Sequence, residues 1–91
     1  MDLVCRDRAE DELVFVEVKT RASAEFGRPA DAVSREKEEL IARGARSWLK
    51  LLDRPEVVFR FDIVEVILGD GSAPVITQLK GAFVLPEERR R

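Results

Sequence analysis

Residues 13–21 read LVFVEVKTR, and this stretch decides how the rest of the chain can fold. Five of its first six residues are apolar, which is typical of a strand that lies inside a sheet with both faces covered. The run nevertheless includes an acid, Glu17, and a base, Lys19. Because side chains alternate between the two faces of a strand, these two lie on the same face. A charged pair in such apolar surroundings indicates a functional site at the end of this strand.

The remaining pattern predicts one α/β domain around this strand. The predicted elements, in order, are a strand over 1–6, the strand over 13–19, a helix from 31 or 34 to 53, a strand over 57–68 and a return strand over 75–79. The connection through the helix is long enough for a crossover, so we expect a small mixed β-sheet with a crossover helix. The chain length suffices for a single domain, 1–91, of which 84–91 is a polar tail.

The predicted helix is amphipathic and should pack on one side only. Apolar residues recur on that side at spacings of three and four positions: Leu40, Ile41, Ala45, Trp48, Leu49 and Leu52. The aromatic ring of Trp48 belongs to this stripe. We therefore interpret Trp48 as a core residue and not as a platform for stacking bases.

The absence of histidine and the presence of a single cysteine, Cys5, exclude several kinds of site. The usual serine and cysteine triads, histidine-ligated metals, thiolate zinc clusters and an intrachain disulfide all need residues that this chain does not have. Cys5 lies within the first predicted strand, where a small packed thiol is expected. Carboxylates and lysines remain as the candidate catalytic groups.

Charge and hydropathy set expectations about location and partners. No apolar run approaches the roughly 20 residues of a membrane-spanning helix, and we see no secretory leader, so we expect a cytoplasmic protein that does not enter a membrane. The net charge of −2 argues against broad affinity for nucleic acids. Lys19, Arg21 and Arg28 follow the second strand without an intervening run of acids, so we expect a local positive patch beside an acidic site.

The predicted hairpin would bring two acids together. With its turn centred between Ala9 and Glu10, Asp2 lies opposite Glu17, with the two Cβ atoms about 4.5 to 5.5 Å apart. Two such carboxylates can share Mg²⁺ or Mn²⁺, and Lys19 could orient or deprotonate a water molecule for attack on a phosphodiester. The alternative is an ordinary ion pair of Glu17 with Lys19 or Arg21 at the strand end, with Asp2 frayed at the terminus.

The same residues carry a resemblance to a known family. Asp2 followed by Glu17-Val18-Lys19 resembles the D…ExK signature of the PD-(D/E)XK nuclease superfamily. More specifically, the ordered segments resemble the bacterial UPF0102 (YraN-like) family from Met1 to about Phe83: MDLVCRD, LVFVEVKTR, FGRPADAV, Lys37, RFDIVEV and ITQLKGAF.

This resemblance implies a fold, an activity and roles for individual residues. The implied fold is a restriction-endonuclease-like, Holliday-junction-resolvase-like core, here without the family's leading helix and strand. Asp2 and Glu17 match the metal-binding acids, and Lys19 matches the catalytic lysine. Lys37 matches a family lysine, which we interpret as a phosphate contact; the alternative is a solvated side chain in the first helical turn. The acid of RFD, Asp62, is interpreted as structural beside its neighbouring arginine.

Three functions compete on these grounds. The first is a metal-dependent endonuclease that uses Mg²⁺ or Mn²⁺ and acts on DNA, including branched or junction DNA, with Arg21 and Lys37 as substrate-binding residues. The second is a catalytically inactive nucleic-acid-binding module of the same fold, and the third is a protein-interaction domain. Because the missing leading strand would leave the first sheet edge exposed, we expect either a truncated start or compensation by a partner chain, the latter as a homodimer through that edge.

Overall fold

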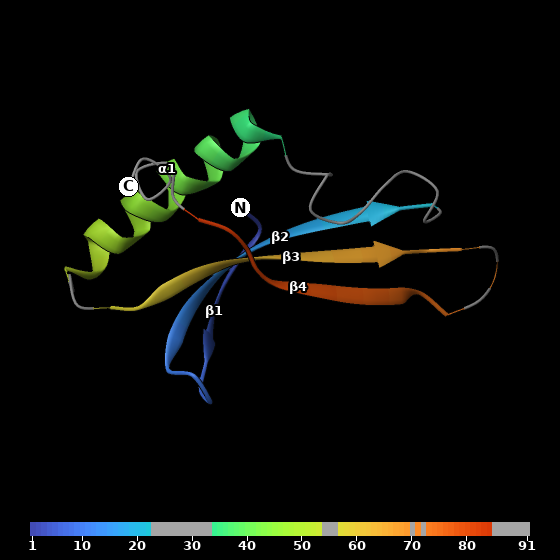
Figure 1. Cartoon of the computed structure of the whole chain (residues 1–91), viewed down its shortest axis with the longest axis horizontal. Coiled ribbons are helices and arrows are strands. Elements are labelled where there is room, and N and C mark those ends of the chain that lie inside the picture. The colour runs from blue at the N-terminus through green and yellow to red at the C-terminus, as the bar shows by residue number, and fades with distance from the viewer. Residues whose placement is uncertain (23–33, 54–56, 70, 72, 85–91) are drawn as a thin grey trace.

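The computed structural model describes residues 1–22, 34–53, 57–69, 71 and 73–84 of the 91-residue chain. Five elements follow one another: β1 (Leu3–Asp7), β2 (Glu12–Arg21), α1 (Arg35–Leu52), β3 (Phe59–Ile67) and β4 (Val75–Phe83). The strands form one sheet in the order β1-β2-β3-β4, with β2 and β3 parallel and the two outer pairs antiparallel. In the chain, α1 connects the parallel strands β2 and β3, and Figure 1 shows it lying across one face of the sheet. The predicted small mixed sheet with a crossover helix is confirmed.

The β1–β2 hairpin has the predicted register. Val4 pairs with Phe15, and the ladder runs from Leu3 opposite Val16 to Asp7 opposite Glu12. The turn is held by the side chain of Asp7, whose Oδ1 accepts hydrogen bonds from the backbone N–H groups of Ala9 (3.0 Å) and Glu10 (3.2 Å). A short acidic side chain that binds the backbone in this way favours a turn over a longer strand.

The ends of α1 are fixed by local hydrogen bonds. Ser34 is the N-cap, and its Oγ accepts a hydrogen bond from the backbone N–H of Lys37 at 3.1 Å. At the other end Asp53 adopts the left-handed conformation, with φ 53°, and its N–H donates to the carbonyl of Lys50. Of the two starting points that the pattern allowed, the later one is therefore correct. This start places Lys37 in the first turn, over the sheet.

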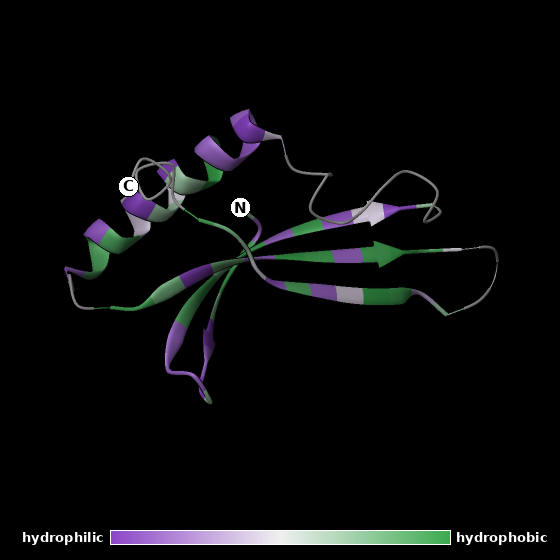
Figure 2. Cartoon of the chain, viewed as in Figure 1, coloured by the Kyte–Doolittle hydropathy of each residue, from purple (hydrophilic) through white to green (hydrophobic). Residues whose placement is uncertain are grey.

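The core lies between α1 and the adjacent face of β2 and β3. Phe15, Phe61 and Ile63 from the strands pack with Ile41 and Ala45 from the helix. Trp48 adds an edge-on contact with Phe15, with ring centroids 6.2 Å apart, as its interpretation as a core residue requires. Figure 2 shows hydrophilic and hydrophobic segments alternating along α1 after a hydrophilic first turn. Leu40, which was expected at the margin of the apolar stripe, is instead 59% exposed.

The last strand is longer than predicted. The pattern placed its end at Leu79, whereas β4 continues to Phe83, whose ring stacks on Phe61 with centroids 4.7 Å apart. The register shifts between Phe61 and Ile63, which indicates a β-bulge, and Gly81 lies in the bulged region with φ 63°. A positive φ at Gly81 costs little, so the strand can bend and resume pairing. Of the predicted tail 84–91, only Val84 is among the described residues.

A buried acid, Asp62, secures this bulge on the face opposite α1. Asp62 is completely buried and accepts four hydrogen bonds: from Arg60 Nε (3.0 Å), Arg60 Nη2 (3.3 Å), Gln78 Nε2 (2.8 Å) and the backbone N–H of Gly81 (2.9 Å). Arg60 Nη1 also donates to Asp7 Oδ2 at 3.0 Å, which ties β3 to the end of β1. The contacts agree with the structural interpretation of Asp62 beside Arg60.

The outer edge of β1 has no strand partner among the described residues. Cys5 on this strand is exposed, so the expectation of a packed thiol is wrong, and Leu3 is 53% exposed. Dimerisation through this edge stays a prediction, which sedimentation equilibrium would check by the mass of the particle. Within the described residues, no helix is both long and apolar enough to cross a membrane.

Candidate active site

The candidate site lies on the helix-facing side of β2, just beyond the core. Phe15 on this face is buried under α1, and alternation places Glu17, Lys19 and Arg21 on the same face in turn. Glu17 is itself buried, with 4% of its surface exposed, although it carries a charge. A buried carboxylate needs compensating charges or hydrogen bonds, so its neighbours indicate what this site is built to hold.

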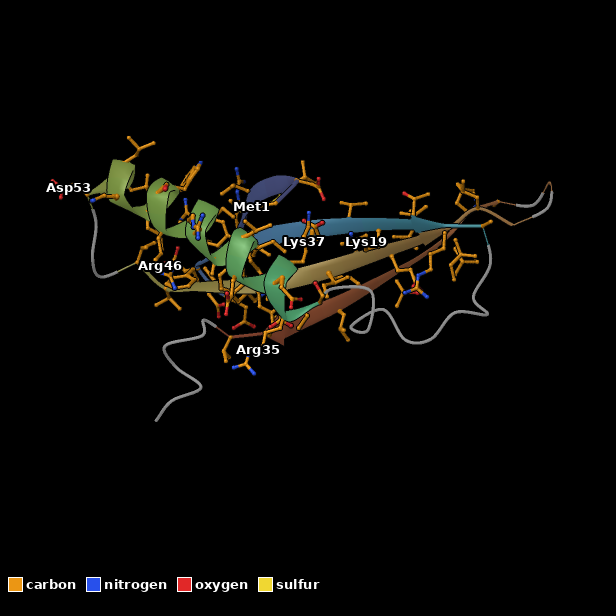
Figure 3. The ribbon with its side chains drawn as sticks, turned by 90° about the horizontal axis from the view of Figure 1, so that it is seen from above. Met1, Lys19, Arg35, Lys37, Arg46 and Asp53 are labelled. Carbon is orange, nitrogen blue, oxygen red and sulfur yellow. The ribbon has the colours of Figure 1, made fainter. Side chains whose placement is uncertain are left out.

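The neighbours of Glu17 are ammonium groups. Lys19 Nζ lies 3.5 Å and Lys37 Nζ 3.6 Å from Glu17 Oε2, and the α-amino nitrogen of Met1 lies 3.2 Å from Oε1. Figure 3 shows Met1, Lys37 and Lys19 close to one another along β2. The contact to Oε1 is an ion pair without hydrogen-bond geometry, and within the described chain Oε1 accepts no hydrogen bond. One oxygen of a buried carboxylate is therefore left with unused acceptor capacity.

Lys37 reaches this site from a distant part of the sequence. It lies in the first turn of α1, where the hydrogen bond from its N–H to the Ser34 cap fixes the backbone. Its side chain is partly exposed, 41%, and extends to Glu17 on β2. The structure thus places Lys37 beside the predicted acid and not as an isolated solvated side chain. Lys19 and Lys37 together leave two ammonium groups at the surface above one buried carboxylate.

Asp2 is close to this site but does not face Glu17 in the predicted way. The ladder begins at Leu3, and Asp2 Oδ2 accepts a hydrogen bond from the backbone N–H of Val18 at 2.8 Å. The N–H of Asp2 donates to the carbonyl of Val16 at 2.9 Å. The ladder therefore ends at Leu3, one residue before the expected pairing of Asp2 with Glu17. The carboxylate of Asp2 is anchored on the backbone next to Glu17, and Asp2 is exposed.

Residues that could hold a metal are few at this site. No group of three or more acidic, histidine or cysteine side chains suited to a metal occurs in the ranges that the structure describes. Mg²⁺, however, keeps several waters and is often held by one or two carboxylates together with substrate phosphates. Glu17, with its unsatisfied Oε1, and the adjacent exposed Asp2 fit that sparse kind of oxygen donor set.

A second acid on this face, Glu65, was missed in the sequence. Glu65 lies on β3 directly across the ladder from Lys19, and its Oε2 is 3.1 Å from Nε of Arg21. The signal was present in RFDIVEV: alternation from Phe61 and Ile63 places Glu65 on the core face, where an acid is unexpected. The structure therefore brings Arg21 to Glu65 and Lys37 to Glu17. Arg28 of the predicted positive patch lies outside the described residues.

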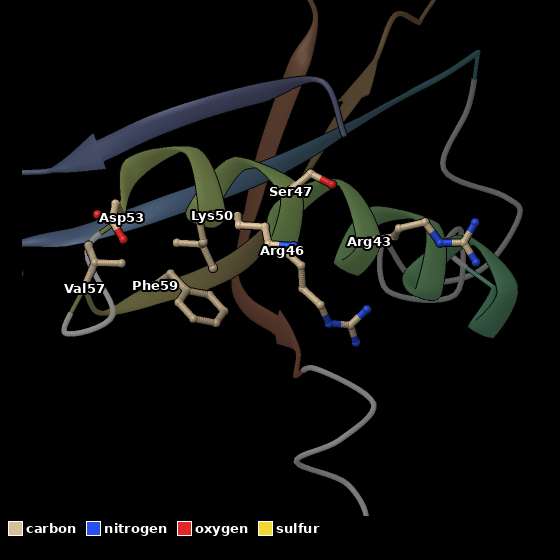
Figure 4. Close-up of a pocket in the computed structure, with 8 residues that line it drawn as sticks. Arg43, Arg46, Ser47, Lys50, Asp53, Val57 and Phe59 are labelled. Carbon is tan, nitrogen blue, oxygen red and sulfur yellow. The ribbon is translucent and has the colours of Figure 1, made fainter.

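A well-defined cavity lies away from this site. It has a volume of about 620 Å³ between α1 and the start of β3, with Leu49, Val57 and Phe59 against it and Arg43, Arg46 and Lys50 around it. Figure 4 shows the guanidinium groups of Arg43 and Arg46 extending away from the helix. The carboxylate–lysine cluster of β2 does not contribute to this cavity. This cavity is therefore separate from the carboxylate–lysine cluster near Glu17.

Comparison with known sequences identifies the family of this chain. Residues 1–66 match the family described as "Uncharacterised protein family UPF0102". A UPF0102 protein of Trichlorobacter lovleyi is 41% identical over 85 residues, which cover 93% of this chain and 66% of that protein. UPF0102 proteins of Nocardia farcinica and Solibacter usitatus are each 45% identical over 83 residues, 91% of this chain, and cover 64% and 60% of their own lengths. This chain spans less than two thirds of these relatives, and it belongs to the UPF0102 family.

Proposed function

We propose that this chain forms the catalytic core of a metal-dependent endonuclease that hydrolyses DNA phosphodiesters, including those of branched or junction DNA. The observation that carries the proposal is the buried carboxylate of Glu17 with Lys19 and Lys37 at 3.5 and 3.6 Å. Ordinary core strands exclude such a cluster because removing a charged group from water costs on the order of several kcal/mol per ion. A cluster kept despite this cost is a candidate for catalysis.

The charges of the site suit a phosphate. Lys19, Arg21 and Lys37 supply three cationic side chains at this site, where the acids are Glu17, Glu65 and Asp2. The cationic side chains are gathered here although the whole chain has a net charge of −2. With a divalent cation held by the acids, the cationic side chains would stabilise the charge that develops on phosphorus-bound oxygens during hydrolysis.

Each residue has a specific role in the proposed reaction. Glu17 and Asp2 would hold Mg²⁺ or Mn²⁺, which supplies charge stabilisation and a more acidic water. Lys19 is the ammonium closest to Glu17 on the same strand, and it orients the attacking water. Lys37 binds a non-bridging phosphate oxygen from the helix side, and Arg21 binds the nucleic-acid backbone farther along β2. The water oxygen bonds to phosphorus and its proton passes to solvent, while the bond to the leaving sugar oxygen breaks and that oxygen takes a proton from solvent.

The first test compares cleavage and binding on several DNA structures. We expect a four-way junction, a branched duplex or a linear duplex to be cut in the presence of Mn²⁺ or Mg²⁺, and no cutting when the metal is chelated. Cleavage is measured by gel electrophoresis of end-labelled DNA. Binding, measured by fluorescence anisotropy, should weaken with salt because phosphate contacts release counterions. Cleavage that persists after chelation, or an absence of both binding and cleavage, would contradict the proposal.

One observation favours a binding module without turnover as the second candidate. Asp2 is hydrogen-bonded to the backbone of Val18, and the described contacts of Glu17 are with ammonium groups and not with a second acid. A site arranged in this way could bind phosphates through its lysines without cleaving them. Salt-dependent binding that is unchanged by metal, together with no cleavage of any DNA structure, would support this candidate over the nuclease.

A further inference from the structure

Glu65 is the second buried acid on the face that carries the candidate site. Its side chain is 6% exposed, and within the described residues its Oε2 accepts no hydrogen bond. The same oxygen lies 3.1 Å from Nε of Arg21, an ion pair without hydrogen-bond geometry. The Arg21 side chain is also largely buried, with 14% exposed. This pair is therefore more desolvated than the surface ion pairs that contribute little to proteins.

The backbones of both residues are held in place by the sheet. Glu65 lies on a central strand, between Lys19 on β2 and Thr77 on β4. Arg21 is the last residue of β2, and its carbonyl accepts a hydrogen bond from the N–H of Leu68 at 2.9 Å. Sheet pairing therefore fixes the two backbones, so that the ion pair depends only on the rotamers of the two side chains. The ion pair fixes a guanidinium group on the same face as Lys19, one alternation farther along the strand.

A buried ion pair at this position is not explained by stability. Well-packed apolar residues of similar volume usually stabilise a core as well as a buried pair does, or better. A fixed guanidinium, in contrast, loses little conformational freedom when it binds a phosphate, and its planar fork matches phosphate oxygens. Alternate residues of a strand are about 6.6 Å apart, so the backbone of Arg21 lies one such step beyond that of Lys19, a step comparable to the spacing of consecutive phosphates along one nucleic-acid strand.

From these contacts we infer that Glu65 is a positioning residue, which orients Arg21 to bind the phosphate next to the one held at Glu17 and Lys19. The ligand is a phosphodiester of the nucleic-acid backbone, and this inference rests on the proposed function. In this arrangement Glu65 does not touch the substrate. It acts through Arg21, and it helps the site to engage two consecutive phosphates of one strand.

The substitution Glu65→Gln separates positioning from simple electrostatics. Glutamine keeps the size of the side chain but removes one negative charge beside a DNA-binding face. If only the net charge mattered, Glu65→Gln would bind DNA more tightly and with at least the same salt dependence. If Glu65 positions Arg21, the variant binds about three- to tenfold more weakly. The slope of log K against log[salt] also falls by about 0.9, as if one phosphate contact were lost.

The experiment measures DNA affinity at several salt concentrations by fluorescence anisotropy for Glu65→Gln, Arg21→Ala and the double variant. We expect Arg21→Ala to reduce affinity by about tenfold and the slope by about 0.9, and the double variant to match Arg21→Ala. In cleavage assays Glu65→Gln should raise KM more than it lowers kcat, because the lost contact contributes to binding. Glu39→Gln, an exposed residue of α1, is the charge-matched control and should leave both affinity and slope unchanged.

The outcomes separate this inference from the function on which it rests. If the wild-type chain binds and cleaves DNA while Glu65→Gln binds more tightly, or keeps the wild-type slope, the positioning role is wrong and the nuclease stands. If the wild-type chain binds no DNA, both fall. Thermal unfolding followed by circular dichroism checks that Glu65→Gln is folded. If it is not, Arg21→Lys decides: it keeps the charge but loses the fork, and unchanged affinity in that variant would overturn the inference.

Discussion

Replacing Glu17 with glutamine is expected to reduce the rate of DNA cleavage by about 100- to 10,000-fold, the range that a single acid–base or charge-stabilising group contributes. Glutamine fills the same space but cannot bind a divalent cation as a carboxylate does, and it no longer compensates the ammonium groups of Lys19 and Lys37. The measurement is kcat on the DNA structure that the wild-type chain cuts fastest, at saturating Mn²⁺.

The fold should survive this substitution. Lys19 and Lys37 have side chains that are 30% and 41% exposed, so both ammonium groups can turn to solvent when their partner is lost. Because Glu17 itself is buried, we expect the free energy of unfolding to fall by about 1 to 3 kcal/mol, which is less than the roughly 5 to 15 kcal/mol by which domains are stable. Lys19→Met should show a comparable loss of cleavage with the fold intact. A Glu17→Gln variant that cuts DNA at the wild-type rate would refute the proposed site. Equal rates would mean that the cleavage does not depend on Glu17, whether it comes from another part of the chain or from a contaminating nuclease present in both preparations.

Asp62→Ala is expected to destabilise the chain by about 3 to 5 kcal/mol, the cost of removing one partner from a buried ion pair. The substitution removes the carboxylate that accepts two hydrogen bonds from Arg60, one from Gln78 and one from the N–H of Gly81, and of the described contacts it leaves Arg60 those with Asp7 and Glu12. Because domains are stable by only about 5 to 15 kcal/mol, this loss is a substantial part of the total stability. The free energy of unfolding is measured by urea denaturation.

Asp11→Asn is the matched control for this prediction. Asp11 also pairs with an arginine, Arg6 at 2.9 Å, but its side chain is 80% exposed. Asn tolerates the left-handed conformation that Asp11 adopts, with φ 53°, so the backbone should not be strained. We expect a change within about 0.5 kcal/mol, as for exposed surface substitutions. Equal losses in the two variants would show that the buried network around Asp62 has no special weight.

The hydrogen-bond network around Asp62 should make the free energy of unfolding depend on pH in the acidic range. Burial raises the pKa of Asp62, but hydrogen bonds from Arg60, Gly81 and Gln78 outweigh burial and leave that pKa below its ordinary value. The N–H of Glu10 and the guanidinium of Arg60 lower the pKa of Asp7 in the same direction. Carboxylates with lowered pKa values stabilise the fold above their unfolded pKa of about 3.9, and this contribution is lost as the pH falls through the folded value. As the pH is lowered below about 4, the urea concentration at the unfolding midpoint should decrease, and this decrease should be smaller in Asp62→Ala than in the wild-type chain.

Local sequence patterns were sufficient to predict the strands, the helix and the part of the site that lies on β2. The apolar run around Phe15 identified a central strand, and alternation alone placed Glu17 and Lys19 on one face, as observed. The register of the hairpin followed from its turn, so the pairing of Val4 with Phe15 was correct. The extension of this register to Asp2 failed because the carboxylate of Asp2 can bind the backbone N–H of Val18. Local competition of this kind ends a ladder without changing the hydrophobic pattern.

Other features could not be predicted because they depend on packing between distant segments. The length of β4 depended on a bulge held by Asp62, which lies 19 residues from Gly81 in the chain. The exposure of Leu40 depended on how α1 is rotated over the sheet, since a stripe of this width leaves its marginal residues undecided. Cys5 was exposed because its strand is at an edge of the sheet and not covered by another element of the described chain.

By itself the sequence determined which segments are strands or helix and which side chains share a strand face, because these properties follow from short-range periodicity. Tertiary structure decided which charged groups meet. Lys37 reaches Glu17 because α1 begins above the end of β2, and Arg21 reaches Glu65 because β2 and β3 pair in one particular parallel register. These contacts join residues that are far apart in the chain. Their formation depends on the crossover and on desolvation in the folded sheet, and neither of these can be read from a local pattern.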